Sequence, residues 1–395
     1  MRLDEGTMRI GAKSKIKLVA ETEKTQTVDE NKIQMGAEKK QIGSEMKQTR
    51  FPVQQKRRRV GSLSLRAVSA SAILLVVSAS RPARAEVREI TIAKEFGIGY
   101  LPYLIMEHEK LVEKHAKTRG LGDLKVNWKT FGGSGFMQSA MISGQLEFCS
   151  SGVPWFVLLW DKMKGEVKSP GALDSMPIYL NTRDPKIKTL KDFGEGNKIA
   201  LPAIKSSIQA ITLQMAAARV FGAAQATKLD PLTVSLSHPD AMTALLSGAS
   251  GIDSHFTSPP FQDLELKDPH IHRVLSSYEV LDGAATFIIT ATTSKFQKAN
   301  PKTFDAFVGA LEEAQTFIGS KKREAAQIYL SMSGDKRLSL DDLLKMLDNP
   351  EYRFTLVPEG VMKYATFMAS TGVIKHKPAD WKELFFSNVH RLPGS

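Results

Sequence analysis

The hydrophobic pattern from residue 86 onward repeats a short apolar strand, a small-residue turn and an amphipathic helix. Alternating β-branched positions predict the first strand, and Pro102 suits the first turn of the helix that follows. The elements predicted are a strand at 88–94, a helix at 102–116, a strand at 124–130, a helix at 136–143 and a strand at 146–150. This alternation is typical of α/β architecture with buried strands.

A second unit of the same kind begins beyond Lys186. Its strand covers 197–203, and Ser206 and Gln209 have the spacing of a capping box at the start of a helix that ends at Phe221. A further helix is predicted at 238–248. The part after Asn300 is rich in helices, predicted at 300–317, 324–330, 340–347, 358–370 and 378–389.

The two units share a weak repeat with an offset of 104 residues. Residues 140–144 (AMISG) match 244–248 (ALLSG), and in both places a strand and a small-polar turn ending in proline follow. Two lobes built on one plan explain the match. Chance similarity between Ala/Leu-rich helices is the alternative.

The net charge of +12 is concentrated in the first 85 residues. That segment has 18 of the 54 basic and 8 of the 42 acidic residues, which leaves 36 and 34 for the rest. A nearly neutral remainder gives no reason to expect a nucleic acid as partner.

The charged segment has the layout of a secretory signal. A basic run at 56–59 precedes an apolar stretch at 67–79 and Ala83-Arg84-Ala85, so we expect export to the periplasm with cleavage after Ala85. A membrane anchor is the alternative, although the apolar stretch is short for one. Met46 is the suspected start codon, residues 1–45 then being an artefactual extension, and the choice between general and twin-arginine export stays open.

Catalytic motifs are not found in the sequence. It has no nucleophile elbow, zinc-protease motif, phosphate loop or dinucleotide fingerprint, and Cys149 is the single cysteine. His270 and His272 have a metal-like spacing but no acidic or cysteine partner, and Ser134 suits a helix cap. We expect a protein that is not an enzyme and uses no cofactor or metal.

Several small-residue turns instead deliver helix N-termini, where free N–H groups favour polar or anionic ligands. They lie at 132–135, at 151–152 and at 206–207. Aromatic residues stand beside them, as in pockets for small organic molecules. These are Phe96, Tyr100, Trp155 and Phe256, with His255 adjacent. Residues 155–160 also fit a core helix, and His255 also fits a packed residue.

Five short segments together resemble one family. They are 97–102 (GIGYLP), 132–134 (GGS), 143–148 (SGQLEF), 189–193 (TLKDF) and 300–301 (NP). In this order they resemble the nitrate/sulfonate/taurine-type substrate-binding proteins of ABC transporters, over roughly residues 86–390. The family has Asp where this chain has Glu147, although Asp253 keeps that residue type in the second copy.

The resemblance implies a type II periplasmic-binding-protein fold, in which two α/β lobes enclose a ligand cleft. Residues 86–180 and 285–395 would form the first lobe, with the helix-rich C-terminal part, and residues 181–284 the second. The implied ligand-binding residues are Ile98, Gly99, Tyr100, Gly133, Ser134, Ser151, Gly152, Ser206 and Ser207, with His255 and Phe256 closing the cleft.

The function implied is that of a monomeric periplasmic solute-binding component of an ABC importer, which delivers its solute to an inner-membrane permease. The solute would be small and anionic or polar, such as a sulfonate, taurine, nitrate or an aromatic acid. No Arg or Lys is fixed in the expected pocket loops, which weakens the case for a fully ionised anion. A ligand-sensing subunit and an enzyme similar to the pyrimidine-precursor synthases are the alternatives.

Overall fold

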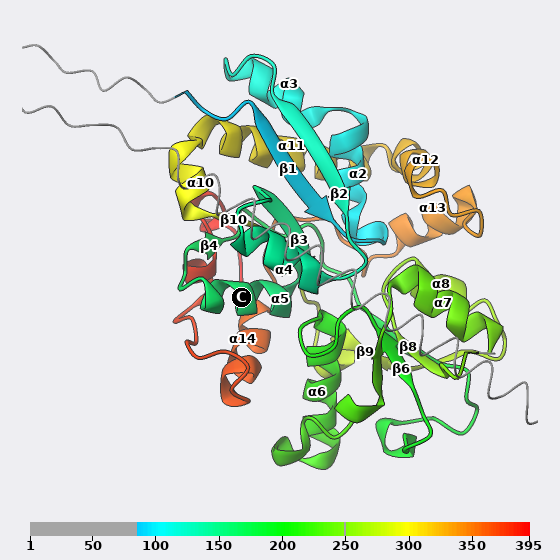
Figure 1. The fold of residues 1–395 in the computed structure, drawn as a ribbon. Coiled ribbons are helices and arrows are strands. Elements are labelled where there is room, and N and C mark those ends of the chain that lie inside the picture. The colour runs from blue at the N-terminus through cyan, green and yellow to red at the C-terminus, as the bar shows by residue number, and fades with distance from the viewer. Residues whose placement is uncertain (1–84, 249) are drawn as a thin grey trace, which may run out of the picture. The chain divides into compact units, whose positions relative to one another are not determined.

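The computed structural model describes residues 85–248 and 250–395, and the expected signal segment at 1–84 lies outside them. Two five-stranded sheets organise this described part of the chain (Figure 1). The first sheet has the order β2 (Lys125–Thr130), β1 (Glu89–Lys94), β3 (Phe148–Gly152), β10 (Ile288–Thr293) and β4 (Val167–Lys168). The second has the order β7 (Thr233–Ser235), β6 (Ile199–Leu201), β8 (Ser254–Phe256), β5 (Tyr179–Thr182) and β9 (His272–Ser276).

The two sheets follow the same plan. In the first, β1 pairs in parallel with β2 and β3, and β10 runs antiparallel to β3. In the second, β6 pairs in parallel with β7 and β8, and β5 runs antiparallel to β8. The helices of the sequence repeat lead into β3 and β8, which hold the same place in their sheets. The repeat is therefore structural, and two α/β lobes are confirmed.

Helices cover both sheets. Those associated with the first lobe are α2 (Leu101–His108), α3 (Leu111–Thr118), α4 (Ser134–Ile142), α5 (Val153–Lys162), α10 (Ser294–Ala299), α11 (Pro301–Ser320), α12 (Lys322–Ser333), α13 (Leu340–Asp348) and α14 (Val361–Ser370). Those of the second lobe are α6 (Ile208–Phe221), α7 (His238–Ser247), α8 (Phe261–Glu265) and α9 (Ser277–Val280). In Figure 1 the C-terminal helices lie beside the first sheet, because α11 packs on α2 and α3.

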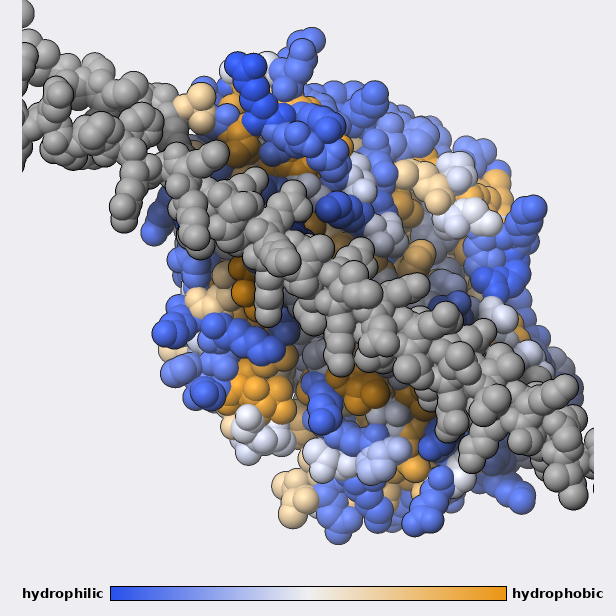
Figure 2. Space-filling model, in the orientation of Figure 1, coloured by the Kyte–Doolittle hydropathy of each residue, from blue (hydrophilic) through white to orange (hydrophobic). Residues whose placement is uncertain are grey.

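The apolar positions of the central strands in the first sheet are buried. Ile90 and Ile92 of β1 and the whole of β3 are buried between helices, as in sheets covered on both faces. Trp155 and Phe156 on α5 are fully buried, which confirms a core helix over 155–160. Among the described residues no helix is long and apolar enough to cross a membrane, and polar side chains cover much of the described surface in Figure 2.

Three sequence-based predictions of helices need correction. The helix predicted at 102–116 is interrupted at Lys110, whose φ of 53° takes the backbone out of the helical region and separates α2 from α3. Ser207, and not Ser206, caps α6 by accepting a hydrogen bond from the N–H of Ala210. The helix predicted at 378–389 is two short 3₁₀ turns, Trp381–Leu384 and Ser387–Val389.

Two crossover segments, residues 169–178 and 281–287, join the lobes. They lie side by side, since Ser175 bridges Thr286, and Ala172 extends the pairing to Ile289 in β10. Asp174 strengthens this pairing, because its Oδ1 accepts a hydrogen bond of 3.2 Å from the N–H of Ile288. A paired double crossover of this kind can act as a hinge between lobes.

Candidate functional site

The lobes meet at the ends of their strands, where a cavity of about 20 Å³ lies between them. A space of this size accommodates about one water molecule. Both lobes line it. The lining residues are Glu95, Phe96, Tyr100, Ser134, Ser151, Gly152, Pro202, Ser207, Ile208, Gln209, His238 and Phe287.

A wider cavity of about 710 Å³ opens next to the small one. Glu95, Phe96 and Tyr100 line both, so the two cavities are the outer and inner parts of one cleft. Phe96 is 42% exposed and offers an apolar surface where the parts join. The outer part is large enough for a small organic molecule, within the usual range of ligand pockets.

The lobes touch closely around the inner cavity. The N–H of Ile98 donates a hydrogen bond of 3.1 Å to the carbonyl of Pro259. A β-carbon on Gly152 would lie 2.6 Å from Cβ of Ile208, and one on Gly133 would lie 2.6 Å from the carbonyl oxygen of Pro202. Both glycines therefore let the lobes approach.

Glu95 follows β1 directly, which brings its carboxyl group to the edge of the sheet where the lobes meet. The hydroxyl of Ser151 donates a hydrogen bond of 2.7 Å to Oε1 of Glu95. The surrounding protein removes much of the water around Glu95 and raises its pKa to about 7, although the Ser151 bond opposes this shift. Glu95 thus changes its charge close to neutral pH.

Two other polar residues, Ser134 and Tyr100, line the same inner cavity. The hydroxyl of Ser134 at the start of α4 is 1% exposed and has no hydrogen-bond partner among the described residues. The hydroxyl of Tyr100 donates to the carbonyl of Ser150 at 3.2 Å. Burial, followed by the nearby carboxyl groups of Glu95 and Asp174, raises the pKa of Tyr100 well above its usual value, so this residue acts as a neutral donor.

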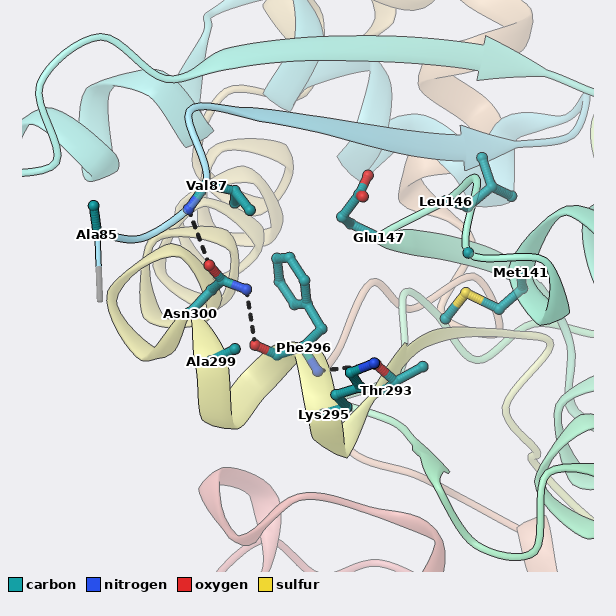
Figure 3. Close-up of a pocket in the computed structure, with 11 residues that line it drawn as sticks. Ala85, Val87, Met141, Leu146, Glu147, Thr293, Lys295, Phe296, Ala299 and Asn300 are labelled. Atoms are coloured by element: carbon teal, nitrogen blue, oxygen red, sulfur yellow. Dashed lines mark hydrogen bonds between the residues drawn. The ribbon is translucent and has the colours of Figure 1, made fainter. Parts of the chain in front are cut away.

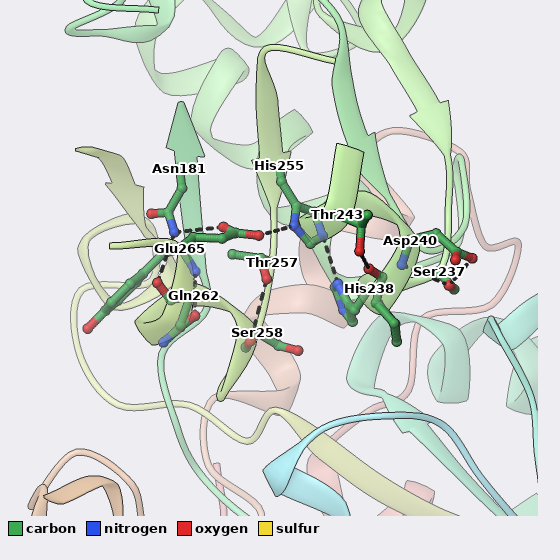
Figure 4. Close-up of polar contacts among 12 residues, drawn as sticks. Asn181, Ser237, His238, Asp240, Thr243, His255, Thr257, Ser258, Gln262 and Glu265 are labelled. Carbon is green, nitrogen blue, oxygen red and sulfur yellow. Dashed lines mark hydrogen bonds and ion pairs between the residues drawn. The ribbon is translucent and has the colours of Figure 1, made fainter. Parts of the chain in front are cut away.

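A buried chain of polar side chains extends from the inner cavity into the second lobe (Figure 4). Nδ1 of His238 lies 2.9 Å from Nε2 of His255, and Nδ1 of His255 lies 2.6 Å from Oε1 of Glu265. The other carboxyl oxygen of Glu265 accepts a hydrogen bond of 3.0 Å from Asn181. His255 and Glu265 are completely buried.

From Gln209 to Glu265, the hydrogen bonds between these side chains all donate in one direction. Nε2 of Gln209 lies 3.3 Å from Nε2 of His238, and an amide nitrogen only donates, so His238 accepts there and donates through Nδ1 to His255. His255 in turn donates to Glu265. Burial lowers the pKa of His255 to about 3 and that of His238 well below its usual value, so both rings are neutral.

The structure brings five of the eleven expected ligand-binding residues to the inner cavity. These are Tyr100, Ser134, Ser151, Gly152 and Ser207. The other six expected residues are not among those that line the inner cavity. Ile98 and Gly133 lie against the second lobe, and Gly99 lies against Ile288. His255 contacts His238, Phe256 follows it in β8, and Ser206 precedes the α6 cap.

Sequence reasoning did not select Glu95, Gln209 or His238 for the site. Glu95 stands immediately after the first predicted strand, and His238 at the start of a predicted helix, and strand ends and helix starts are the places to search. Gln209 was expected to cap its own helix. In the structure its amide bonds to His238 instead.

A different cavity, of about 340 Å³, lies at the opposite end of β1 (Figure 3). Val87, Phe296 and Asn300 line it, and the side chain of Asn300 accepts a hydrogen bond of 3.0 Å from the N–H of Val87. This cavity is confined to the first lobe. Closure of one lobe on the other would not enclose a molecule bound there.

Among the described residues, neither a metal-binding cluster nor a positively charged side chain lines the inner cavity. Within residues 85–248 and 250–395, no group of three or more His, Cys, Asp or Glu side chains could bind a metal ion. His270 is exposed, and Nε2 of His272 contacts the carbonyl of Ile187. The inner cavity has no Lys or Arg among its lining residues.

Two α/β lobes joined by two crossovers, with a cleft at the strand ends, define the class of fold. The chain has the fold of periplasmic binding proteins, as the family resemblance implied. Among solved structures it is similar to the alkanesulfonate-binding protein SsuA from Xanthomonas axonopodis pv. citri bound to MOPS, with a TM-score of 0.59 and 15% identity, over 74% of this chain and 96% of that chain.

Two further structures show the same likeness. The periplasmic aliphatic sulphonate-binding protein SsuA from Escherichia coli has a TM-score of 0.56 and 16% identity, over 76% of this chain and 93% of that chain. The periplasmic nitrate-binding protein NrtA from Synechocystis PCC 6803 has a TM-score of 0.55 and 13% identity, over 75% and 84%. No protein-family model and no curated protein matches the sequence.

Proposed function

We propose that this protein is the periplasmic solute-binding component of an ABC importer. It binds a small polar organic solute between its lobes, closes over it and delivers it to a permease in the inner membrane. In this proposal the protein is a monomer that is cleaved after Ala85. Residues 86–180 and 285–395 form the first lobe, and residues 181–284 form the second.

The observation that carries the proposal is the cleft between the lobes. Ser134 and Ser151 from the first lobe and Ser207 and Gln209 from the second line one cavity, so closure encloses a molecule bound there. The paired crossovers supply a hinge. The fold shared with sulfonate- and nitrate-binding proteins supports capture rather than catalysis.

Thermal unfolding in the presence of candidate solutes tests the proposal. A solute at about 100 times its Kd adds about 2.7 kcal/mol to the free energy of unfolding. We expect such a shift with a member of at least one of four solute classes, together with a smaller radius of gyration in X-ray scattering. The classes are sulfonates, amino acids, amines and aromatic acids. If none of these solute classes stabilises the protein, the proposal is wrong.

A further inference from the structure

The inner cavity carries one carboxyl group and no positive group. Glu95 is its only acidic lining residue, and Lys and Arg are absent from its lining. The other titratable residues there are Tyr100 and His238, and both are neutral at physiological pH for the reasons given above. Ionised Glu95 therefore makes the inner cavity negative.

Among the residues that the structure describes, no neighbouring cation neutralises Glu95. Lys94 precedes it in the chain, but its ammonium group pairs with Glu107 and lies 5.0 Å from the ring centre of Trp128. Oε1 of Glu95 accepts from Ser151, whereas Oε2 has no hydrogen-bond partner among the described residues. One carboxyl oxygen is thus free for a donor that enters the cleft.

The groups around Glu95 include acceptors for a ligand that donates hydrogen bonds. The amide nitrogen of Gln209 uses one of its two N–H groups on His238, and its carbonyl oxygen remains available as an acceptor. Ser207 accepts the capping hydrogen bond of α6 and keeps its own O–H, and Pro154 removes one N–H donor from the start of α5. The unpartnered hydroxyl of Ser134 can accept as well as donate.

Electrostatics oppose an anion next to Glu95. Two like charges about 4 Å apart repel by about 4 kcal/mol at the effective dielectric constant of a protein surface. An ammonium group at the same place gains a similar amount, before the cost of removing its water. The sign of the ligand charge near Glu95 therefore decides whether binding is favourable.

We propose that the solute carries a protonated amine, which donates to the free carboxyl oxygen of Glu95 in the inner cavity, while its skeleton lies against Phe96. This inference rests on the proposed function and narrows its ligand class. A second, negative end is compatible with the wider cavity, where Lys336 has no pairing partner among the described residues. A solute whose only charge is negative is excluded.

The test uses matched pairs of solutes in isothermal titration calorimetry with the full chain. Each pair has one skeleton that ends in either an ammonium or a hydroxyl group: taurine with isethionate, phenylethylamine with phenylethanol, and putrescine with butanediol. We expect an amine to bind more tightly than its hydroxyl partner by about 30-fold or more. Nitrate and ethanesulfonate should not bind.

Glu95→Gln removes the charge and keeps the shape of the side chain. It should abolish the preference for the amine, while Glu312→Gln, an exposed substitution on α11, should leave it unchanged. Below about pH 7 the affinity of the wild type for the amine should fall about tenfold per pH unit, because the proton on Glu95 must leave. That pH dependence should be absent in Glu95→Gln.

The outcomes separate this inference from the proposed function. Tight binding of hydroxyl or purely anionic solutes, undiminished in Glu95→Gln, overturns the amine assignment and leaves solute capture intact. An affinity that rises as the pH falls does the same, because Glu95 would then donate its proton to an anion. Failure of every solute to bind counts against solute capture itself, and the amine assignment falls with it.

Discussion

Gly152, the last residue of β3, faces Ile208, the first residue of α6, across the boundary between the lobes. A β-carbon on Gly152 would lie 2.6 Å from Cβ and 2.8 Å from Cγ2 of Ile208. The backbone of Gly152 has φ −62° and ψ 152°, which any residue adopts. The glycine is therefore required by the approach of the second lobe and not by its own backbone.

Gly152→Ala should separate the lobes without unfolding either one. Real Cβ atoms essentially never come within 3.0 Å of a neighbour, so α6 has to shift away. We expect the affinity for the solute to fall about tenfold or more, because closure no longer completes the site. Calorimetry gives the affinity, and X-ray scattering should show a protein that stays open when the solute is present.

Gly319→Ala is the matched control. Gly319 lies on α11, and an added β-carbon there meets no atom within 4 Å. The substitution should stabilise the helix by up to about 1 kcal/mol and leave binding unchanged. If Gly152→Ala binds and closes like this control, the close approach of Gly152 to Ile208 is not what limits closure.

His255→Ala should destabilise the second lobe. The imidazole of His255 is completely buried and connects His238 to Glu265, so its removal leaves a cavity and two buried polar groups without their partner. We expect a loss of about 2–4 kcal/mol in the free energy of unfolding. Urea denaturation of the wild type and the variant measures it.

His270→Ala provides the comparison for that loss. The side chain of His270 is 77% exposed, and among the described residues its ring forms a hydrogen bond only with Asp268, so its removal should change the stability by no more than about 0.5 kcal/mol. Equal effects of the two substitutions would show that the buried chain contributes nothing beyond an ordinary surface contact.

Local patterns made the fold predictable. The alternation in β1, the proline at the start of α2 and the Ser-Gly ends of the repeated helices are properties of neighbouring residues, and they predicted two α/β lobes correctly. The break at Lys110 was missed because nothing in the apolar pattern of 102–116 indicates a left-handed residue there.

The lining of the inner cavity was predictable in part from the sequence. Ser134, Ser151 and Ser207 were found because they follow strands or begin helices, which are marked in the sequence. The contacts of Glu95 and His238 depend on how one lobe meets the other and which way a side chain points. Such tertiary relationships leave no periodic trace along the chain.

Cys149 should be inert in the folded protein. Its side chain is completely buried in β3, and burial raises the pKa of its thiol far above the usual value, so the reactive thiolate does not form. We expect a disulfide reagent to titrate about one thiol per chain in denaturant and almost none in buffer. Rapid labelling of the native protein would contradict the burial of β3.

Glu95 should make the stability of the unliganded protein depend on pH. Its pKa is about 7 in the folded state, against 4.5 as the ordinary value, so between these values the folded protein binds more protons than the unfolded chain. The contribution of Glu95 to stability is then fully present at low pH and is lost as the pH rises through 7.

Glu95→Gln isolates this effect, because other buried carboxyl groups, such as Asp174 and Glu265, also have raised pKa values and act in the same direction. The stability of the variant relative to the wild type should increase between pH 5 and pH 8 by about 1–2 kcal/mol, a value reduced by the contact of Glu95 with solvent in the cleft. Urea denaturation at each pH measures the difference. A difference that stays constant across this range would mean that Glu95 is ionised throughout, and that its carboxylate is already stabilised before any solute enters.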